Sequence, residues 1–321
     1  MKYSILIPAY KKRFLSKAIE SCLAQTYNDF ELIIVNDHSP EGLDSVVTRY
    51  NDDRIKYYEN DRNIGAVDVV DNWNKCLSYA QGDFVICMGD DDRLMPCCLE
   101  EYERLINKYN YLDVYHARTE IIDEDGVVVG LQEARPEWES AYSALWHQCY
   151  CHRIQFIGDF LFRTISLKKE GGFYKLPLAT FSDNISTIRA AKKYGIANTQ
   201  KICFQYRMNG GTITNNGNPR ILVNSIKAAY DWFVNFLQDS PSNDTDIKYR
   251  RFLLEKELRT HIYEMMMIVI NWDLSKEGVS AIPYWKSQYK ELGIDEEQMK
   301  LEFKSFRRYW YISKFKKILG R

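Results

Sequence analysis

Hydrophobic and polar positions over the first 110 residues alternate between two patterns. Four short apolar runs end in polar turns, and each is followed by a stretch in which apolar residues recur every three or four positions. Such runs are typical of strands and such spacing is typical of helices. We therefore predict strands at 3–10, 30–35, 55–59 and 84–88, and helices at 14–26, 43–50, 66–80 and 97–109. Strands that alternate with helices pair in parallel through right-handed crossovers, so the pattern predicts an α/β fold with a Rossmann-like, mostly parallel sheet.

The regular alternation is lost after residue 110. We expect strands, one hairpin and one helix at 112–117, 120–129, 158–167, 181–194 and 202–207, and we interpret the irregular aromatic segment 133–157 as a candidate acceptor loop. A loop rich in Gly, Asn and Thr extends to Pro219 and is the strongest boundary signal in the chain. Beyond it the pattern is almost entirely helical. We predict a first domain at 1–215 and a C-terminal helical region at 216–321.

The overall charge gives no reason to expect a nucleic-acid partner. The chain has 43 basic and 44 acidic residues, a formal net charge of −1. Eight cysteines, several inside apolar runs, and an N-terminus without a basic and apolar signal sequence favour a reducing, cytoplasmic location. No apolar run approaches the length of about 18 residues that a membrane span requires. The segment 147–152 contains two His and two Cys, but it lacks the usual ligand spacing of a zinc site.

The last 21 residues form a separate charged feature. Residues 301–321 contain seven basic residues and one acidic residue, interleaved with aromatic residues. A basic aromatic helix suits an anionic membrane surface, where each cation contributes about 1 kcal/mol. A solvated helix that packs on the domain or on a partner subunit fits equally well. Peripheral contact with the inner face of the membrane and a homodimer therefore both stay open.

Three consecutive carboxylates follow the fourth predicted strand. Asp90, Asp91 and Asp92 come directly after the apolar run 84–88, at the carboxyl end of a buried strand. Ligands of open α/β sheets bind at that edge, and three like charges there repel unless a cation or solvent neutralises them. Mg²⁺ or Mn²⁺ suits carboxylate oxygens and can hold a phosphate in turn. The alternative is a solvated acidic turn that precedes a helix.

The sequence contains no glycine-rich loop of the kind that commonly binds phosphate in nucleotide sites on such sheets. The first strand is followed by Pro8-Ala9-Tyr10, and neither G-x-G-x-x-G nor a Walker A motif is present. This excludes the usual dinucleotide dehydrogenases and P-loop enzymes. A bound diphosphate would be held mainly by metal, which again points to the three acids.

Several motifs together resemble those of the family 2 glycosyltransferases. The segments match in order and spacing, and they lie at 5–10, 25–27, 31–39, 63–65, 82–96, 181–183 and 206–207. The resemblance covers roughly residues 1–215. It implies a GT-A fold, a nucleotide-sugar donor, a divalent metal and an inverting sugar transfer.

The resemblance also implies roles for individual residues. Pro8 and Tyr10 would line the base and ribose pocket, and Asp37 would accept the N3–H of a uracil or thymine ring; its alternative role is an Asx turn with Ser39. Other donor-side residues are Asn63, Gly65, Asn72, Asp90 and Arg207.

The acidic motif departs from the family pattern in one place. Aligned on Pro96, Gly89 stands where the family usually has its first acid, and Asp91 falls on the metal ligand. We therefore prefer Asp91 and keep Asp90 and Asp92 as further candidates.

Asp183 matches the family's catalytic base. One base must take the proton of the acceptor hydroxyl while its oxygen attacks the anomeric carbon. The alternative role of Asp183 is a helix-capping or first-turn acid. Ser182 replaces the first member of an acidic pair.

From these residues we predict a metal-dependent inverting glycosyltransferase that uses Mn²⁺ or Mg²⁺. The predicted donor is a nucleoside-diphosphate sugar, most simply a UDP-sugar, and the predicted acceptor is a hydroxyl of a glycan or lipid-linked glycan in surface polysaccharide synthesis. Two alternatives stay open. One is a sugar nucleotidyltransferase, which would want a glycine-rich basic loop after the first strand. The other is a noncatalytic nucleotide-sugar or glycan binding module.

Overall fold

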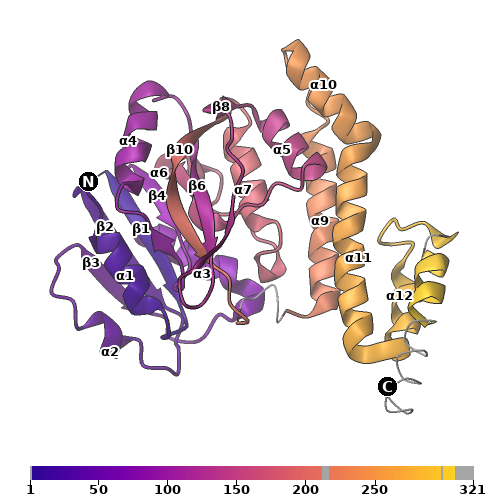
Figure 1. The fold of residues 1–321 in the computed structure, drawn as a ribbon, viewed down its shortest axis with the longest axis horizontal. Helices are drawn as coiled ribbons and strands as arrows, with labels where there is room; N and C mark the ends of the chain where they lie inside the picture. Colours follow the sequence, from indigo (N-terminus) through magenta and orange to yellow (C-terminus); the bar gives the residue numbers. More distant parts are fainter. Residues whose placement is uncertain (1, 212–216, 298, 308–321) are drawn as a thin grey trace.

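One twisted sheet forms the centre of the molecule. The computed structural model describes residues 2–211, 217–297 and 299–307 (Figure 1). Within these residues ten strands join in the order β3-β2-β1-β4-β9-β6-β10-β5, with β7 beside β6 and β8 beside β10. The strands are β1 Tyr3–Ala9, β2 Phe30–Asn36, β3 Ile55–Glu59, β4 Phe84–Cys87, β5 Arg93–Leu94, β6 Val114–Ile122, β7 Val128–Leu131, β8 Trp138–Glu139, β9 Phe160–Arg163 and β10 Ile196–Arg207.

The N-terminal half of the sheet is parallel, as the sequence pattern predicts. β1 pairs in parallel with β2 and β4, and β2 pairs in parallel with β3. Alternate residues of β1 enter two different cores, because side chains alternate across a strand: Ile5 and Ile7 pack on one face and Leu6 on the other. Both faces are covered by helices, which explains the continuous apolar runs. These helices are α1 Leu15–Leu23, α2 Asp44–Val47, α3 Val69–Tyr79 and α4 Cys98–Lys108.

The second half of the sheet is mixed. β9 pairs antiparallel with β4 and β6, whereas β6 and β10 are parallel neighbours. The predicted α/β class is confirmed, and so is the loss of regular alternation after α4. The sequence pattern did not reveal α5 Ala141–Tyr150 inside the irregular segment or α6 Thr164–Lys169 after β9. Most positions of α5 are buried, so its sequence shows no clear polar face.

β10 is longer than predicted. Its first half carries the polar residues Asn198 and Thr199, which hide the strand pattern in the sequence although both side chains are buried. Each has a partner, because Asn198 donates to the carbonyl of Pro136 at 2.8 Å and Thr199 accepts from the N–H of Arg118 at 2.9 Å. The strand ends at Arg207, beside the acidic turn.

The C-terminal region is helical, and α9 and α11 lie side by side along one flank of the molecule (Figure 1). Its helices are α9 Pro219–Phe236, α10 Asp244–Phe252, α11 Leu258–Glu277 and α12 Ile282–Gln288. One apolar core runs from Leu6 of the sheet through Ile185 of α7, residues Ser182–Ala191, to Val223 of α9 and Ile270 of α11. The division at residue 215 stays a prediction, and its boundary falls among residues that the structure does not describe.

No helix among the described residues has both the length and the apolar character needed to cross a membrane. The predicted membrane contact rests on the basic tail, which lies outside the described residues from 308 onward. That prediction, the homodimer and the cytoplasmic location stay predictions.

Candidate active site

The acidic turn follows β4, and its three carboxylates face three different surroundings. Oδ2 of Asp90 accepts the backbone N–H groups of Tyr10 and Lys11, each at 2.7 Å. Asp90 is buried, and burial together with the charge of Asp91 raises the pKa of its carboxyl to about 6. This first acid of the triplet thus joins the turn to the end of β1.

Asp92 is equally buried and is held by the chain around it. Its Oδ1 accepts the backbone N–H of Arg207 at 2.9 Å, and its Oδ2 accepts that of Gly89 at 3.3 Å. Burial first, and then the charge of Asp91, hold the pKa of Asp92 well above its usual range. A nearby cation would relieve this repulsion.

Asp91 is the acid with the freest carboxylate. Its side chain is partly exposed, and Oδ2 accepts a hydrogen bond from Asn209 at 2.7 Å. A Cβ atom on Gly89 would lie 2.7 Å from Oδ1 of Asp91 and 2.9 Å from Oδ2 of Asp92. The missing side chain at position 89 therefore leaves a space onto which two carboxylate oxygens converge.

Arg207 supports this turn from the end of β10. Its guanidinium is fully buried, donates from Nε to the carbonyl of Asp91 at 2.8 Å, and donates from Nη1 to the carbonyls of Asp123 and Glu124. The guanidinium also lies 4.4 Å from the ring centre of Phe14. Diphosphate contact by Arg207 stays a prediction; the contacts present give it a role in positioning Asp91.

The predicted donor-side residues meet at the carboxyl end of β2. Oδ1 of Asp37 accepts from Asn60 and from the N–H of Ile64, each at 2.9 Å, and Oδ2 accepts from the N–H of Gly65 at 3.2 Å. Asn60 also reaches Asn72 at 3.0 Å, and Asn63 donates to the carbonyl of Asp37. Four predicted residues, Asp37, Asn63, Gly65 and Asn72, therefore form one hydrogen-bonded cluster.

The Asp37 carboxylate has room for one more hydrogen bond beyond those donated by the described residues. A carboxylate has about four acceptor positions, and three N–H donors occupy this one. The Asx turn at this place is made by Asn36, whose Oδ1 accepts the N–H of Ser39 at 2.8 Å. His38, directly after Asp37, has a left-handed backbone with φ 51°, which is a strained conformation for a non-glycine residue. Asp37 is thus held by a strained, hydrogen-bonded loop.

Pro8 and Tyr10 lie beside this cluster at the end of β1. Pro8 is partly exposed, and Tyr10 is 42% exposed. The Ser39 hydroxyl donates to the carbonyl of Tyr10 at 2.6 Å, which ties the ends of β1 and β2 together. Tyr10 is thus exposed at the carboxyl edge of the sheet, next to the loop that holds Asp37.

Asp183 lies in the first turn of α7, after a strained loop. Leu178, Ala179 and Phe181 all have left-handed backbones, with φ of 59°, 53° and 63°. Ser182 closes this loop from the inside, because its hydroxyl accepts the N–H of Leu176 at 3.1 Å. Strained non-glycine residues persist only where the surroundings enforce them, and they cluster at functional sites.

Burial raises the pKa of the Asp183 carboxyl to about 7, and the charge of Asp159 adds to the rise. Hydrogen bonds from the backbone N–H groups of Asn184 and Asp183 oppose it. A carboxylate with this pKa is a far better proton acceptor than an ordinary aspartate at neutral pH. Asp183 therefore has the first-turn position of the structural alternative and also the raised pKa that suits a base.

Tyr206 of β10 links Asp183 to the acidic turn. Burial and then the charges of four carboxylates, Asp92, Asp91, Asp183 and Asp159, raise the pKa of its phenol above the usual range. The phenol therefore lies within electrostatic reach of the candidate metal ligands and the candidate base together. Tyr206 was part of the sequence resemblance but was not predicted as a site residue.

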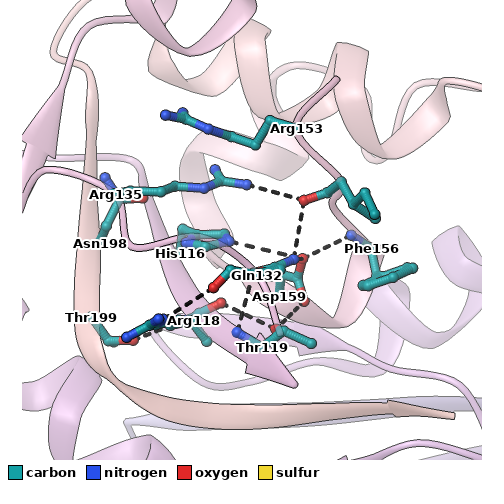
Figure 2. A network of polar contacts seen from close by, with 12 residues as sticks. His116, Arg118, Thr119, Gln132, Arg135, Arg153, Phe156, Asp159, Asn198 and Thr199 are labelled. Carbon is teal, nitrogen blue, oxygen red and sulfur yellow. Dashed lines mark hydrogen bonds and ion pairs between the residues drawn. The ribbon is translucent and has the colours of Figure 1, made fainter. Parts of the chain in front are cut away.

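Asp159 belongs to a buried polar network beside this site (Figure 2). Its side chain is fully buried and accepts from the Thr119 hydroxyl, from Gln132 at 2.8 Å and from the backbone N–H of Phe156 at 2.8 Å. Burial raises the pKa of Asp159 to about 6, against those hydrogen bonds. His116 lies 3.8 Å away and is buried, so its pKa falls well below the usual range. Such a network rigidifies the segment that it connects.

The comparison with known families decides the assignment. The sequence profile described as "Glycosyl transferase family 2" matches residues 4–166, half of the chain. The chain belongs to glycosyltransferase family 2. One relative is EpsE of Bacillus subtilis, provisionally described as a glycosyltransferase, at 32% identity over 130 residues. Another is the GalNAc(5)-diNAcBac-PP-undecaprenol beta-1,3-glucosyltransferase of Campylobacter jejuni, at 34% identity over 110 residues. The matches cover 39% and 33% of this chain, and only 46% and 35% of those proteins.

Solved structures confirm that this family-2 chain has a GT-A fold. TarS of S. aureus, residues 1–349 in complex with UDP-GlcNAc, superimposes with a TM-score of 0.64 at 16% identity, over 91% of this chain and 80% of that one. The mannosyltransferase PcManGT of Pyrobaculum calidifontis, in complex with GDP-Man and Mn²⁺, gives 0.54 at 13% identity, over 100% and 88%. At these identities the likeness shows the fold alone.

Proposed function

We propose that this family-2 glycosyltransferase moves a sugar, with inversion, from a UDP-sugar to a hydroxyl of a glycan or lipid-linked acceptor in surface polysaccharide synthesis. The observation that carries the proposal is Asp183, a first-turn carboxylate of α7 that follows a strained loop and whose pKa burial raises to about 7; the phenol of Tyr206 is influenced by its charge and by those of Asp91 and Asp92. An inverting displacement needs one base of this kind and no covalent intermediate. Asp183 would accept the proton of the acceptor hydroxyl.

The uracil base is assigned to the cluster around Asp37. The remaining lone pair of this carboxylate can accept the N3–H of an imide, whereas a guanine ring presents a different donor pattern. The UDP complex of TarS is in line with this assignment, and the GDP-Man complex of PcManGT shows that the fold by itself does not fix the base. Pro8, Tyr10, Asn63, Gly65 and Asn72 would complete the donor side.

The acidic turn fits a divalent cation held jointly with a diphosphate. Asp91 and Asp92 direct oxygens into the space above Gly89, and within the described residues no group of three or more His, Cys, Asp or Glu side chains forms a complete metal site. Mg²⁺ is commonly bound through one or two carboxylates plus substrate phosphates, so a partial protein site is the expected form. Asp91 would hold the ion, with Asp92 and Asp90 beside it. The bound cation would offset the charge that develops on the departing diphosphate.

The direct test is turnover of UDP-glucose, UDP-galactose and UDP-N-acetylglucosamine with Mn²⁺, followed as release of UDP. Wild-type protein should release UDP from at least one donor, and Asp183→Asn should reduce the rate by about 100-fold or more because the base is lost. Thermal shifts with UDP, GDP and dTDP, with and without Mn²⁺, serve as the binding control. Asp183→Asn should keep the UDP shift. Undiminished turnover by this variant would show that Asp183 is not the base. Stabilisation by GDP alone would show that Asp37 does not recognise uracil.

The noncatalytic alternative makes a different prediction in the same experiment. A binding module would be stabilised by a UDP-sugar and Mn²⁺ but would release no UDP from any donor. The raised pKa of Asp183 has no function in such a module, and an acid with a pKa raised in the folded state lowers stability at neutral pH. The enzyme is therefore the function that the geometry supports best.

A further inference from the structure

Two aromatic rings meet face to face beside the candidate active site. The ring centres of Phe156 and Tyr206 lie 3.6 Å apart, and the ring planes are within 5° of parallel. Both side chains are partly exposed. Phe156 comes from the segment before β9 and Tyr206 from the end of β10, so the pair is built from residues 50 positions apart in sequence.

The chain around Phe156 is held at two further points, one on β10 and one on β6 and the residue after β7. A Cβ on Gly158 would lie only 2.2 Å from the ring of Phe204, so this close contact requires a glycine. One residue further on, the buried carboxylate of Asp159 accepts the backbone N–H of Phe156 and fixes it against Thr119 and Gln132 (Figure 2). The stack with Tyr206, the contact of Gly158 with Phe204 and the hydrogen bond to Asp159 thus hold the segment that carries Phe156, although the ring itself is partly exposed.

The position of this pair in the sheet separates it from the donor side. The cluster around Asp37 lies at the ends of β1 and β2, on one side of β4 in the strand order, whereas β9, β6 and β10 lie on the other side. The acidic turn follows β4 and stands between them. Tyr206 directly precedes Arg207, whose backbone N–H donates to Asp92 at 2.9 Å and whose Nε donates to the carbonyl of Asp91 at 2.8 Å, so the pair lies next to the acidic turn, on the side of β4 away from Asp37.

We propose that the stacked pair Phe156 and Tyr206 is a platform, and that the ring of the acceptor sugar, a pyranose, lies on an outer face of this stack, since the two inner faces cover each other. The inference rests on the proposed function and names the acceptor side of the same site. The face of an aromatic ring is electronegative and attracts the weakly positive C–H groups on one face of a pyranose, while the Tyr206 hydroxyl offers a polar edge. Asp159 is a positioning residue, because it acts by holding Phe156.

The test compares transfer with donor hydrolysis in one assay. The donor is whichever UDP-sugar the wild type hydrolyses, and the acceptor probes are methyl β-glycosides of glucose, galactose, N-acetylglucosamine and N-acetylgalactosamine. Phe156→Ala should lower the ratio of transfer to hydrolysis by about tenfold or more, measured as kcat/KM for the glycoside against UDP release without it. Phe156→Leu keeps the apolar volume but loses the flat face, so it should fold normally and show a smaller fall in the same ratio.

Tyr79→Ala is the matched control. It removes one ring from another partly exposed stack, Tyr58 with Tyr79 at 3.8 Å and 1°, which contains no predicted site residue, and it should leave the ratio unchanged. An unchanged ratio in Phe156→Ala would overturn the platform while the wild-type turnover upholds the proposed function. Hydrolysis by the wild type without transfer to any glycoside would do the same. No turnover of any UDP-sugar by the wild type would overturn the proposed function and the platform with it.

Discussion

Asp90 accepts the backbone N–H of Tyr10 at 2.7 Å, so the first acid of the triplet ties the loop after β1 to the turn after β4. The last acid, Asp92, accepts the N–H of Arg207 and ties the same turn to the end of β10. Both carboxylates are buried and committed to the backbone. Asp91 between them is the most exposed of the three, so the three acids are expected to respond differently to substitution.

Asp91→Asn and Asp90→Asn should therefore separate metal binding from turn structure. Asp91→Asn removes the charge that faces the proposed cation, and it should weaken the Mn²⁺-dependent binding of UDP by roughly tenfold or more, about 1.4 kcal/mol. Asp90→Asn keeps a carbonyl oxygen for the N–H groups of Tyr10 and Lys11, so its effect should be smaller. Isothermal titration with UDP, with and without Mn²⁺, measures both. Equal losses in the two variants would argue against Asp91 as the principal ligand.

Gly89→Ala tests the proposed cation site by filling the space between Gly89 and the carboxylates of Asp91 and Asp92. The added Cβ would lie within 3 Å of oxygens of both Asp91 and Asp92, so the two carboxylates must turn away. We expect weaker Mn²⁺-dependent UDP binding with little change in the binding of UDP alone. Gly210→Ala is the matched control, since a Cβ there meets nothing within 4 Å. If Gly89→Ala binds Mn²⁺ and UDP like the wild type, the convergence of the two acids has no role in metal binding.

The sequence predicts those site residues that lie at strand ends, but not those whose roles depend on contacts between distant segments. Strand ends are visible in the sequence, so the pattern of apolar runs alone places Asp37 and the acidic triplet at one sheet edge. Asn60 and Tyr206 could not be ranked, because their roles depend on contacts between distant segments. Phe156 and Asp159 were hidden in a segment without periodicity, and the polar first half of β10 concealed the strand onto which that segment packs. The preference for Asp91 came from the alignment on Pro96, but the backbone partners that hold Asp90 and Asp92 could not be read from the sequence.

Gly158→Ala should destabilise the segment that carries Phe156. The Cβ would lie 2.2 Å from the Phe204 ring, and overpacking of this kind costs typically about 1–3 kcal/mol. At an unfolding entropy of about 2.1 cal/mol/K per residue, each 1 kcal/mol, roughly, lowers the Tm of a chain of 321 residues by about 1–2 °C. Differential scanning calorimetry measures the change, with Gly210→Ala again as the neutral substitution. An unchanged Tm would mean that the contact between Gly158 and Phe204 is loose.

Asp183→Asn should stabilise the protein near neutral pH. The folded-state pKa of about 7 lies above the usual value of about 3.9, so the folded protein holds this proton more tightly than the unfolded chain does. The stabilising effect of the bound proton is complete below pH of about 4 and is lost as the pH rises to about 7. The variant escapes that loss, and its Tm should exceed that of the wild type by about 1–2 °C, or about 1 kcal/mol, at pH of about 8 but not at pH of about 4. Thermal unfolding at both pH values checks this, and a lower Tm at the higher pH would contradict it.

Asp159→Asn should shift the pH dependence of catalysis. Asp183 must be ionised to act as a base, so kcat/KM for transfer should be half-maximal at pH of about 7 and level off above about pH 8. The charge of Asp159 contributes to the raised pKa of Asp183, and removing it favours ionisation of Asp183. The acid limb of the pH profile should therefore move to lower pH in Asp159→Asn, even if loosening of Phe156 lowers the maximum rate. Glu291→Gln, which removes an exposed acid of the C-terminal region, should leave the limb in place. A variant whose rate falls without any shift of the limb would reduce Asp159 to a purely structural support for Phe156.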